Sequence, residues 1–243
     1  MNTSQTTILN RTCHYMIAGA LMLAAPIALA QDGNTTLGVG AGASITTGDN
    51  GTFVGYEAGN LFDRDSDNTM IGAFAGSLGS VGIDNTFVGT RAGMNNIGGD
   101  GVFIGSDAGV NNSNGVDNVF VGEEAGKNNT TGSDNVFIGE DAGYYNTTAS
   151  RNTAVGNKAL RMNTTGFGHT ALGNEALYDT STGLKNTGLG WAAGIDIGVG
   201  SLNTMVGAAA GMATEHANFN TFVGALAGWD NNRANGTTTA TPT

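Results

Sequence analysis

Alternating acidic residues give one short segment of this chain the look of a metal-binding loop. The run Asp63-Arg64-Asp65-Ser66-Asp67 places a carboxylate at every second residue, which is the spacing that calcium loops use. Further on, Asn68 stands where such a loop requires glycine, and Phe74 stands where it requires a bidentate glutamate. We therefore expect a solvated turn at this place and predict no metal site.

Histidine and cysteine, the other residue types that commonly carry chemistry, are few and scattered. The histidines are His14, His169 and His216, and the single cysteine is Cys13. A nucleophile with its base, or a metal cage, needs several such groups close together. The sequence predicts no enzyme and no bound cofactor.

The overall composition is acidic and rich in glycine. The chain has 20 Asp and Glu against 9 Lys and Arg, and 41 of its 243 residues are glycine. So negative a surface repels nucleic acid and anionic lipid, so we expect neither as a partner. The glycines do not recur at every third residue, which excludes collagen.

The first thirty residues have the features of a secretory signal peptide. A weakly basic start is followed by an apolar run from Met16 to Leu29, and Ala28-Leu29-Ala30 supplies small residues for cleavage. We expect residues 1–30 to be removed, Cys13 with them, and the mature chain to be exported without disulfides. Residues 229–243 are predicted to be a polar, disordered tail.

The region between these segments, 31–228, is a repeat with a period of seventeen residues. A glycine preceded by an aliphatic residue and followed three positions later by alanine marks each unit, and one step is sixteen residues long. We number positions in a unit from this marker glycine. The marker glycines are Gly38, Gly55, Gly72, Gly89, Gly105, Gly122, Gly139, Gly156, Gly173, Gly190, Gly207 and Gly224.

A fixed period of this length is typical of a solenoid, in which one coil is stacked many times. Positions −3 and −1 carry Thr or Val and an aliphatic residue, as expected for one face of a short strand. We predict that this face is the interior of an all-β parallel solenoid of about twelve coils. The predicted repeat core is Val54, Ile71, Val88, Ile104, Val121, Ile138, Val155, Val206 and Val223.

Position −2, on the other face of the same strand, is also apolar. A strand with apolar residues on both faces is typically buried on both. One aliphatic side chain per coil contributes roughly 1.5–3 kcal/mol on burial, whereas ordering one residue's backbone costs about 1–2 kcal/mol. We therefore predict that the −2 face is covered by sister subunits in an obligate oligomer. The predicted subunit interface is Phe53, Phe87, Phe103, Phe120, Phe137 and Phe222.

Two polar positions leave alternatives open. Position −4 is usually asparagine, as at Asn118 and Asn220, and these amides either hydrogen-bond along the stack or face water as turn residues. The acids at positions +1 and +2 are expected to be exposed and solvated. They are Asp107, Glu123, Glu124, Glu140 and Asp141.

Units such as Asn85-Thr86-Phe87-Val88-Gly89-Thr90-Arg91-Ala92-Gly93 resemble the head repeats of trimeric autotransporter adhesins, the YadA-like heads. The resemblance extends from Asn34 to about Gly228, although coils in that family are commonly shorter. It implies a left-handed parallel β-roll, a homotrimer, and a place at the cell surface or in the secretions of a Gram-negative-type bacterium. It also implies adhesion to an extracellular matrix, a glycan or a cell-surface ligand.

Two other functions fit the same repeat. Evenly spaced threonines at position −3 suggest binding to ice or another crystal lattice, but the predicted inward orientation of this position argues against it. A passive structural fibre or array subunit, which has no ligand, is the other alternative.

Overall fold

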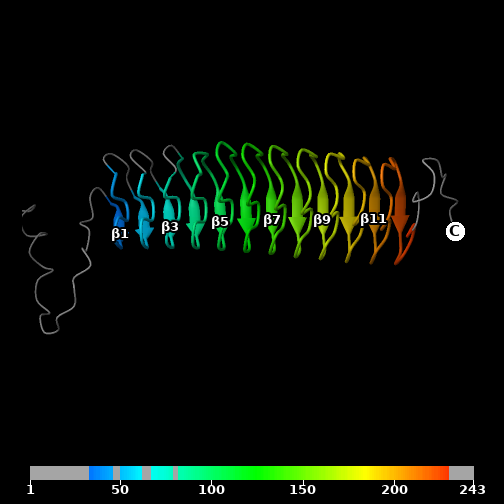
Figure 1. Ribbon diagram of the computed structural model, residues 1–243, viewed down its shortest axis with the longest axis horizontal. Coiled ribbons are helices and arrows are strands. Elements are labelled where there is room, and N and C mark those ends of the chain that lie inside the picture. Colours follow the sequence, from blue (N-terminus) through cyan, green and yellow to red (C-terminus); the bar gives the residue numbers. More distant parts are fainter. Residues whose placement is uncertain (1–32, 46–49, 62–66, 79–81, 230–243) are drawn as a thin grey trace, which may run out of the picture.

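The computed structural model describes residues 33–45, 50–61, 67–78 and 82–229, and these form one parallel sheet of short strands stacked along a rod (Figure 1). The predicted all-β solenoid is confirmed. The predicted signal peptide, the tail after Trp229 and residues 63–66 of the calcium-like segment lie outside the described residues. The strands are β1 Thr35–Leu37, β2 Thr52–Val54, β3 Thr69–Ile71, β4 Thr86–Val88, β5 Val102–Ile104, β6 Val119–Val121, β7 Val136–Ile138, β8 Thr153–Val155, β9 Thr170–Leu172, β10 Thr187–Leu189, β11 Thr204–Val206 and β12 Thr221–Val223.

The strand order follows the chain, and the register repeats from coil to coil. Each strand pairs with the next so that equivalent residues lie side by side, for example Phe103 with Phe120. The sixteen-residue step lies between β4 and β5, where Thr86 still pairs with Val102. The coil before β5 therefore loses one residue without shifting the sheet.

The two faces of the strands are the reverse of the sequence-based assignment. The phenylalanines at position −2, predicted to form a subunit interface, are buried inside the coil, where they are at most 6% exposed. They belong to one hydrophobic core together with the alanines at position +3. The prediction is wrong for all six: Phe53, Phe87, Phe103, Phe120, Phe137 and Phe222.

The aliphatic residues at position −1 lie on the outside of the sheet. The predicted repeat core is therefore also wrong, since all nine of these side chains are exposed or partly exposed. They are Val54, Ile71, Val88, Ile104, Val121, Ile138, Val155, Val206 and Val223.

The size of the phenylalanine ring accounts for this inversion. Phe87, Phe103, Phe120 and Phe137 stack with their ring centroids 4.8–5.1 Å apart, which fills the interior with a continuous column of rings. Glycine at position +4 makes room for each ring. A Cβ on Gly126, for example, would lie 2.7 Å from the Phe120 ring.

The interior is completed by two ladders of amide side chains. At position −4, Asn118 accepts a hydrogen bond from the backbone N–H of Asn135 at 3.0 Å and donates to the Gly132 carbonyl at 2.8 Å. At position +7, Asn129, Asn146 and Asn163 are linked in series by bonds of 2.7 and 2.8 Å. These amides are buried, so hydrogen bonding along the stack, the first of the two alternatives, is confirmed.

The second segment of each coil, which follows the marker glycine, is less regular than the strand. Instead of a second strand, the described residues there show two isolated parallel bridges, which join Asp196 to Asp179 and to Ala213. The marker glycines turn the chain between the segments, with φ between 122° and 140°. Each also lies against the next marker glycine, since a Cβ on Gly122 would be 2.5 Å from the Gly139 oxygen.

Candidate interaction surfaces

The outward face of the sheet is a long stripe in which threonine and aliphatic columns run side by side. Position −3 supplies threonine in nine strands and valine in the three central strands β5, β6 and β7. Position −1 supplies the aliphatic column, in which Ile71 and Ile104 are 39% exposed and Leu172 is 51% exposed. Because like residues pair across neighbouring strands, both columns are continuous along the rod.

The strands of this stripe are evenly spaced, and its side chains are uniformly uncharged. Strands in a sheet lie about 4.8 Å apart, so twelve of them extend over roughly 57 Å. None of the strand residues is charged. An apolar patch that is continuous over this length is typical of a surface used for association.

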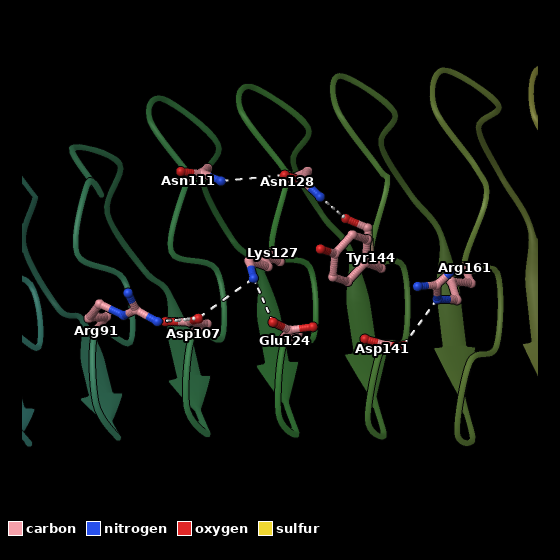
Figure 2. Close-up of polar contacts among 9 residues, drawn as sticks. All are labelled: Arg91, Asp107, Asn111, Glu124, Lys127, Asn128, Asp141, Tyr144 and Arg161. Carbon is pink, nitrogen blue, oxygen red and sulfur yellow. Dashed lines mark hydrogen bonds and ion pairs between the residues drawn. The ribbon is translucent and has the colours of Figure 1, made fainter.

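A second surface, the charged row, lies on the segment of each coil that follows the strand (Figure 2). Arg91 contacts Asp107 at 2.7 Å, and Lys127 lies 3.6 Å from the same carboxylate. Lys127 also contacts Glu124 at 2.5 Å. The hydrogen bond with Glu124 raises the pKa of Lys127, and burial partly opposes the shift.

The charged row continues into an aromatic cluster. Arg161 bonds to Asp141 at 3.0 Å and lies over the rings of Tyr144 and Tyr145, with centroid distances of 5.0 and 5.3 Å. Its guanidinium also bonds to the Tyr178 hydroxyl at 3.3 Å. Nε and Nη1 of Arg161 therefore both donate to groups within the rod, and the cluster is held together by its own contacts.

The predicted exposure of the acids at positions +1 and +2 holds for only some of them. Glu123 and Glu140 are exposed, whereas Asp107 and Asp141 are 6% and 9% exposed. The reason is the pairing described above, since a basic side chain on an adjacent coil covers each aspartate. Within the described residues, no three His, Cys, Asp or Glu side chains are grouped so that they could hold a metal ion.

His169 takes the place of asparagine in the −4 ladder. Its Nδ1 accepts from the Asn186 backbone N–H at 3.1 Å, and its Nε2 lies 2.8 Å from the Gly183 carbonyl. The two ring nitrogens thus act as the oxygen and nitrogen of the amide they replace, which places the proton on Nε2. Burial lowers the pKa of His169 to about 4, against the two backbone hydrogen bonds, which raise it.

Comparison with known protein families, with curated proteins and with solved structures finds no match for this chain. Within the described residues, no helix is long and apolar enough to span a bilayer. The outward stripe of the sheet is a surface whose exposed apolar side chains favour association. The stripe was not predicted from the sequence, because the residues at positions −3 and −1 were expected inside the coil.

Proposed function

We propose that this protein is an exported, rod-shaped surface protein that associates side by side through the outward stripe and presents its remaining sides for adhesion. The observation that supports this is the exposed aliphatic column at position −1, in which Val223 is 69% exposed and Ile138 is 38% exposed. Covering this column with copies of the same chain removes it from water. The phenylalanine column cannot serve this purpose, since it is already inside.

A homotrimer in the manner of YadA-like heads is the assembly we propose. The valines at position −3 of β5, β6 and β7 make the middle of the stripe its most apolar part. Three copies facing one another through this part would bury it, while the charged row would stay at the outside of the assembly. The proposed ligands are extracellular matrix, glycan or cell-surface molecules, and the proposed location is the cell surface or the medium.

The test is the native mass of the purified protein and of a variant with a charged stripe. Val119→Lys and Val136→Lys replace outward side chains in the centre of the stripe, so the fold should survive while association is lost. We expect a trimer for the unchanged chain and a monomer for the double variant at micromolar concentration. Thr131→Lys together with Thr148→Lys, at exposed loop positions, is the matched control and should stay trimeric. A monomeric unchanged chain would contradict the proposal.

Adhesion itself needs a separate measurement. Immobilised trimer should retain matrix proteins, glycans or whole cells above background, and the monomeric variant tests whether the assembled form is required. If trimer forms but retains nothing, the passive structural role replaces adhesion.

Binding to ice or another crystal is a second candidate, and one observation favours it. The threonines at position −3 lie on the outside of the sheet, so the orientation that argued against this function is reversed. From β8 to β12 they form an uninterrupted column. Trimer formation would cover the same column, so the two functions exclude one another. Thermal hysteresis by a monomeric sample would favour ice binding over side-by-side association. Thr187→Lys should then abolish the hysteresis.

A further inference from the structure

The two ends of the sheet carry complementary backbone groups. Between neighbouring coils, the first residue of each strand from β1 to β11 donates its N–H to the residue before the next strand, as Thr204 does to Asn220 at 2.8 Å. In return, the marker glycine of the following coil donates to the last residue of the strand, as Gly224 does to Val206 at 2.8 Å.

At the ends this exchange stops. Among the described residues, the Thr221 N–H and the Val223 carbonyl of β12 have no such partner, and neither has the Gly38 N–H beside β1. Val223 offers the acceptor that a marker glycine needs, and Gly38 offers the donor. The two ends therefore match in the same register that joins the interior coils.

Neither end carries the charges that usually protect an edge strand from pairing. Residues 33–45 and 219–229 include no Asp, Glu, Lys, Arg or His. They expose apolar side chains instead: Val39 is 56% exposed, Leu226 is 56% exposed and Phe219 is 78% exposed. Central coils, in contrast, carry an aspartate at the position of Phe219, as at Asp117 and Asp134.

The marker glycines leave space for a further coil at the β12 end. A Cβ on Gly207 would lie 2.6 Å from Gly224, because successive marker glycines are stacked closely. Among the described residues, a Cβ on Gly224 would find only Ala227, at 4.0 Å. Gly38 of a second copy would fit this open position without a side chain to obstruct it.

We propose that β12 of one copy pairs in parallel with β1 of another, so that the sheet continues from rod to rod. The contact joins two different surfaces, and its repetition gives an open filament instead of a closed ring. This interface is separate from the outward stripe, because it lengthens the assembly without thickening it. The proposal therefore stands or falls independently of the trimer.

Proline at either edge removes one donor that the junction needs. Thr221 is the first residue of an edge strand, where proline is tolerated, and its N–H points out of the rod. The Thr36 N–H also points outward, since the preceding residue, Thr35, donates toward β2 through a 2.7 Å bond to Gly51. Thr221→Val and Thr36→Val retain both donors and serve as matched controls, valine being the residue found at the position of Thr221 in β6.

The experiment measures particle length in the full chain by negative-stain electron microscopy and small-angle scattering over a range of concentrations. Above the micromolar range used for the native-mass measurement, we expect the unchanged chain and both valine variants to form particles several rods long. Thr221→Pro alone and Thr36→Pro alone should give single rods, with at least a tenfold drop in the fraction of longer particles. Circular dichroism and denaturant unfolding check that each proline variant has kept its fold.

Mixing the two proline variants gives the sharpest outcome. Each retains one intact end, so an equal mixture should form pairs of rods, twice the single length and no longer. Single rods of the unchanged chain at every concentration would overturn the proposal. So would proline variants that elongate like the unchanged chain, or a mixture that forms no pairs. If the Val119→Lys and Val136→Lys variant still elongates as a thin filament, end pairing stands although the trimer fails.

Discussion

At the scale of single residues, His169 shows how strictly the interior ladders limit what a position can hold. Of the other eleven coils, nine have asparagine at this place and two have glycine. The imidazole is accepted because its two nitrogens lie where the amide oxygen and nitrogen would be. The effect of histidine at this position on the free energy of unfolding depends on whether its ring is protonated. A protonated ring would lose its acceptor nitrogen and carry a charge in a buried site.

This predicts a pH dependence that asparagine removes. The pKa of His169 is about 4 in the folded protein, below the ordinary 6.5, so between these values the unfolded chain binds the proton more readily. The free energy of unfolding should be constant above pH 6.5 and should fall as pH drops toward 4, by roughly 3 kcal/mol in total from this residue. Urea unfolding at several pH values should show this loss in the unchanged chain and not in His169→Asn.

The control for this prediction is the exposed His216. His216→Asn should leave the pH dependence of unfolding as it is in the unchanged chain. If His169→Asn retains the full loss of stability below pH 6.5, the ring is not the group responsible.

At the scale of the coil, interior volume is conserved by exchanging two positions. Six of the twelve coils combine a phenylalanine at −2 with glycine at +4, but the coils of β8 and β9 combine Ala154 with Leu160 and Ala171 with Leu177. All four of these side chains are fully buried. In these two coils, the leucine at +4 therefore fills the space that a phenylalanine ring at −2 fills in other coils. Leu160 and Leu177 do so at φ values of 54° and 51°.

A double substitution tests this exchange. Phe120→Ala should lower the free energy of unfolding by about 3–5 kcal/mol, because it leaves a cavity in the ring column. Gly126→Leu alone should also destabilise, because its Cβ would be 2.7 Å from the Phe120 ring. Together they should recover at least half of the loss, since they recreate the coil of β8. Denaturant unfolding of all four chains gives the coupling, and additive losses would contradict the exchange.

The same exchange explains what could and could not be predicted from sequence. The marker glycines predict the period, the strand positions and the parallel stacking, and the structure confirms them. The choice of inner face was wrong, because Phe120 and Val121 are both apolar and hydrophobicity cannot rank the two faces. The informative signal was volume: Leu160 and Leu177 interrupt the +4 glycines in the coils where position −2 shrinks to alanine. That pairing indicates that these two positions share one interior.

At the scale of the whole molecule, each coil touches only its two neighbours, so the effect of a change depends on where along the rod it falls. A central coil has a neighbour on both sides. The coil of β12 has one, and its marker glycine faces open space among the described residues.

Equivalent substitutions at the centre and at this end should therefore differ. Gly122→Ala and Gly224→Ala both place a side chain at positive φ, of 136° and 122°, which costs on the order of 1–3 kcal/mol. Gly122→Ala also places its Cβ 2.5 Å from the Gly139 oxygen, so it should destabilise by clearly more. Thermal unfolding of dilute samples measures the stability of each variant. Equal losses of stability would contradict the prediction that the close approach of neighbouring coils adds to the effect of Gly122→Ala.

The paired register of the twelve strands has a consequence for heredity. Because every coil offers its neighbours the same contacts, duplicating or deleting a block of seventeen codons leaves only coil-to-coil contacts of the existing kind. The sixteen-residue step shows that the sheet also tolerates a block that is one residue short. Rod length can thus change between generations in increments of one strand spacing, and no new type of contact between coils is required.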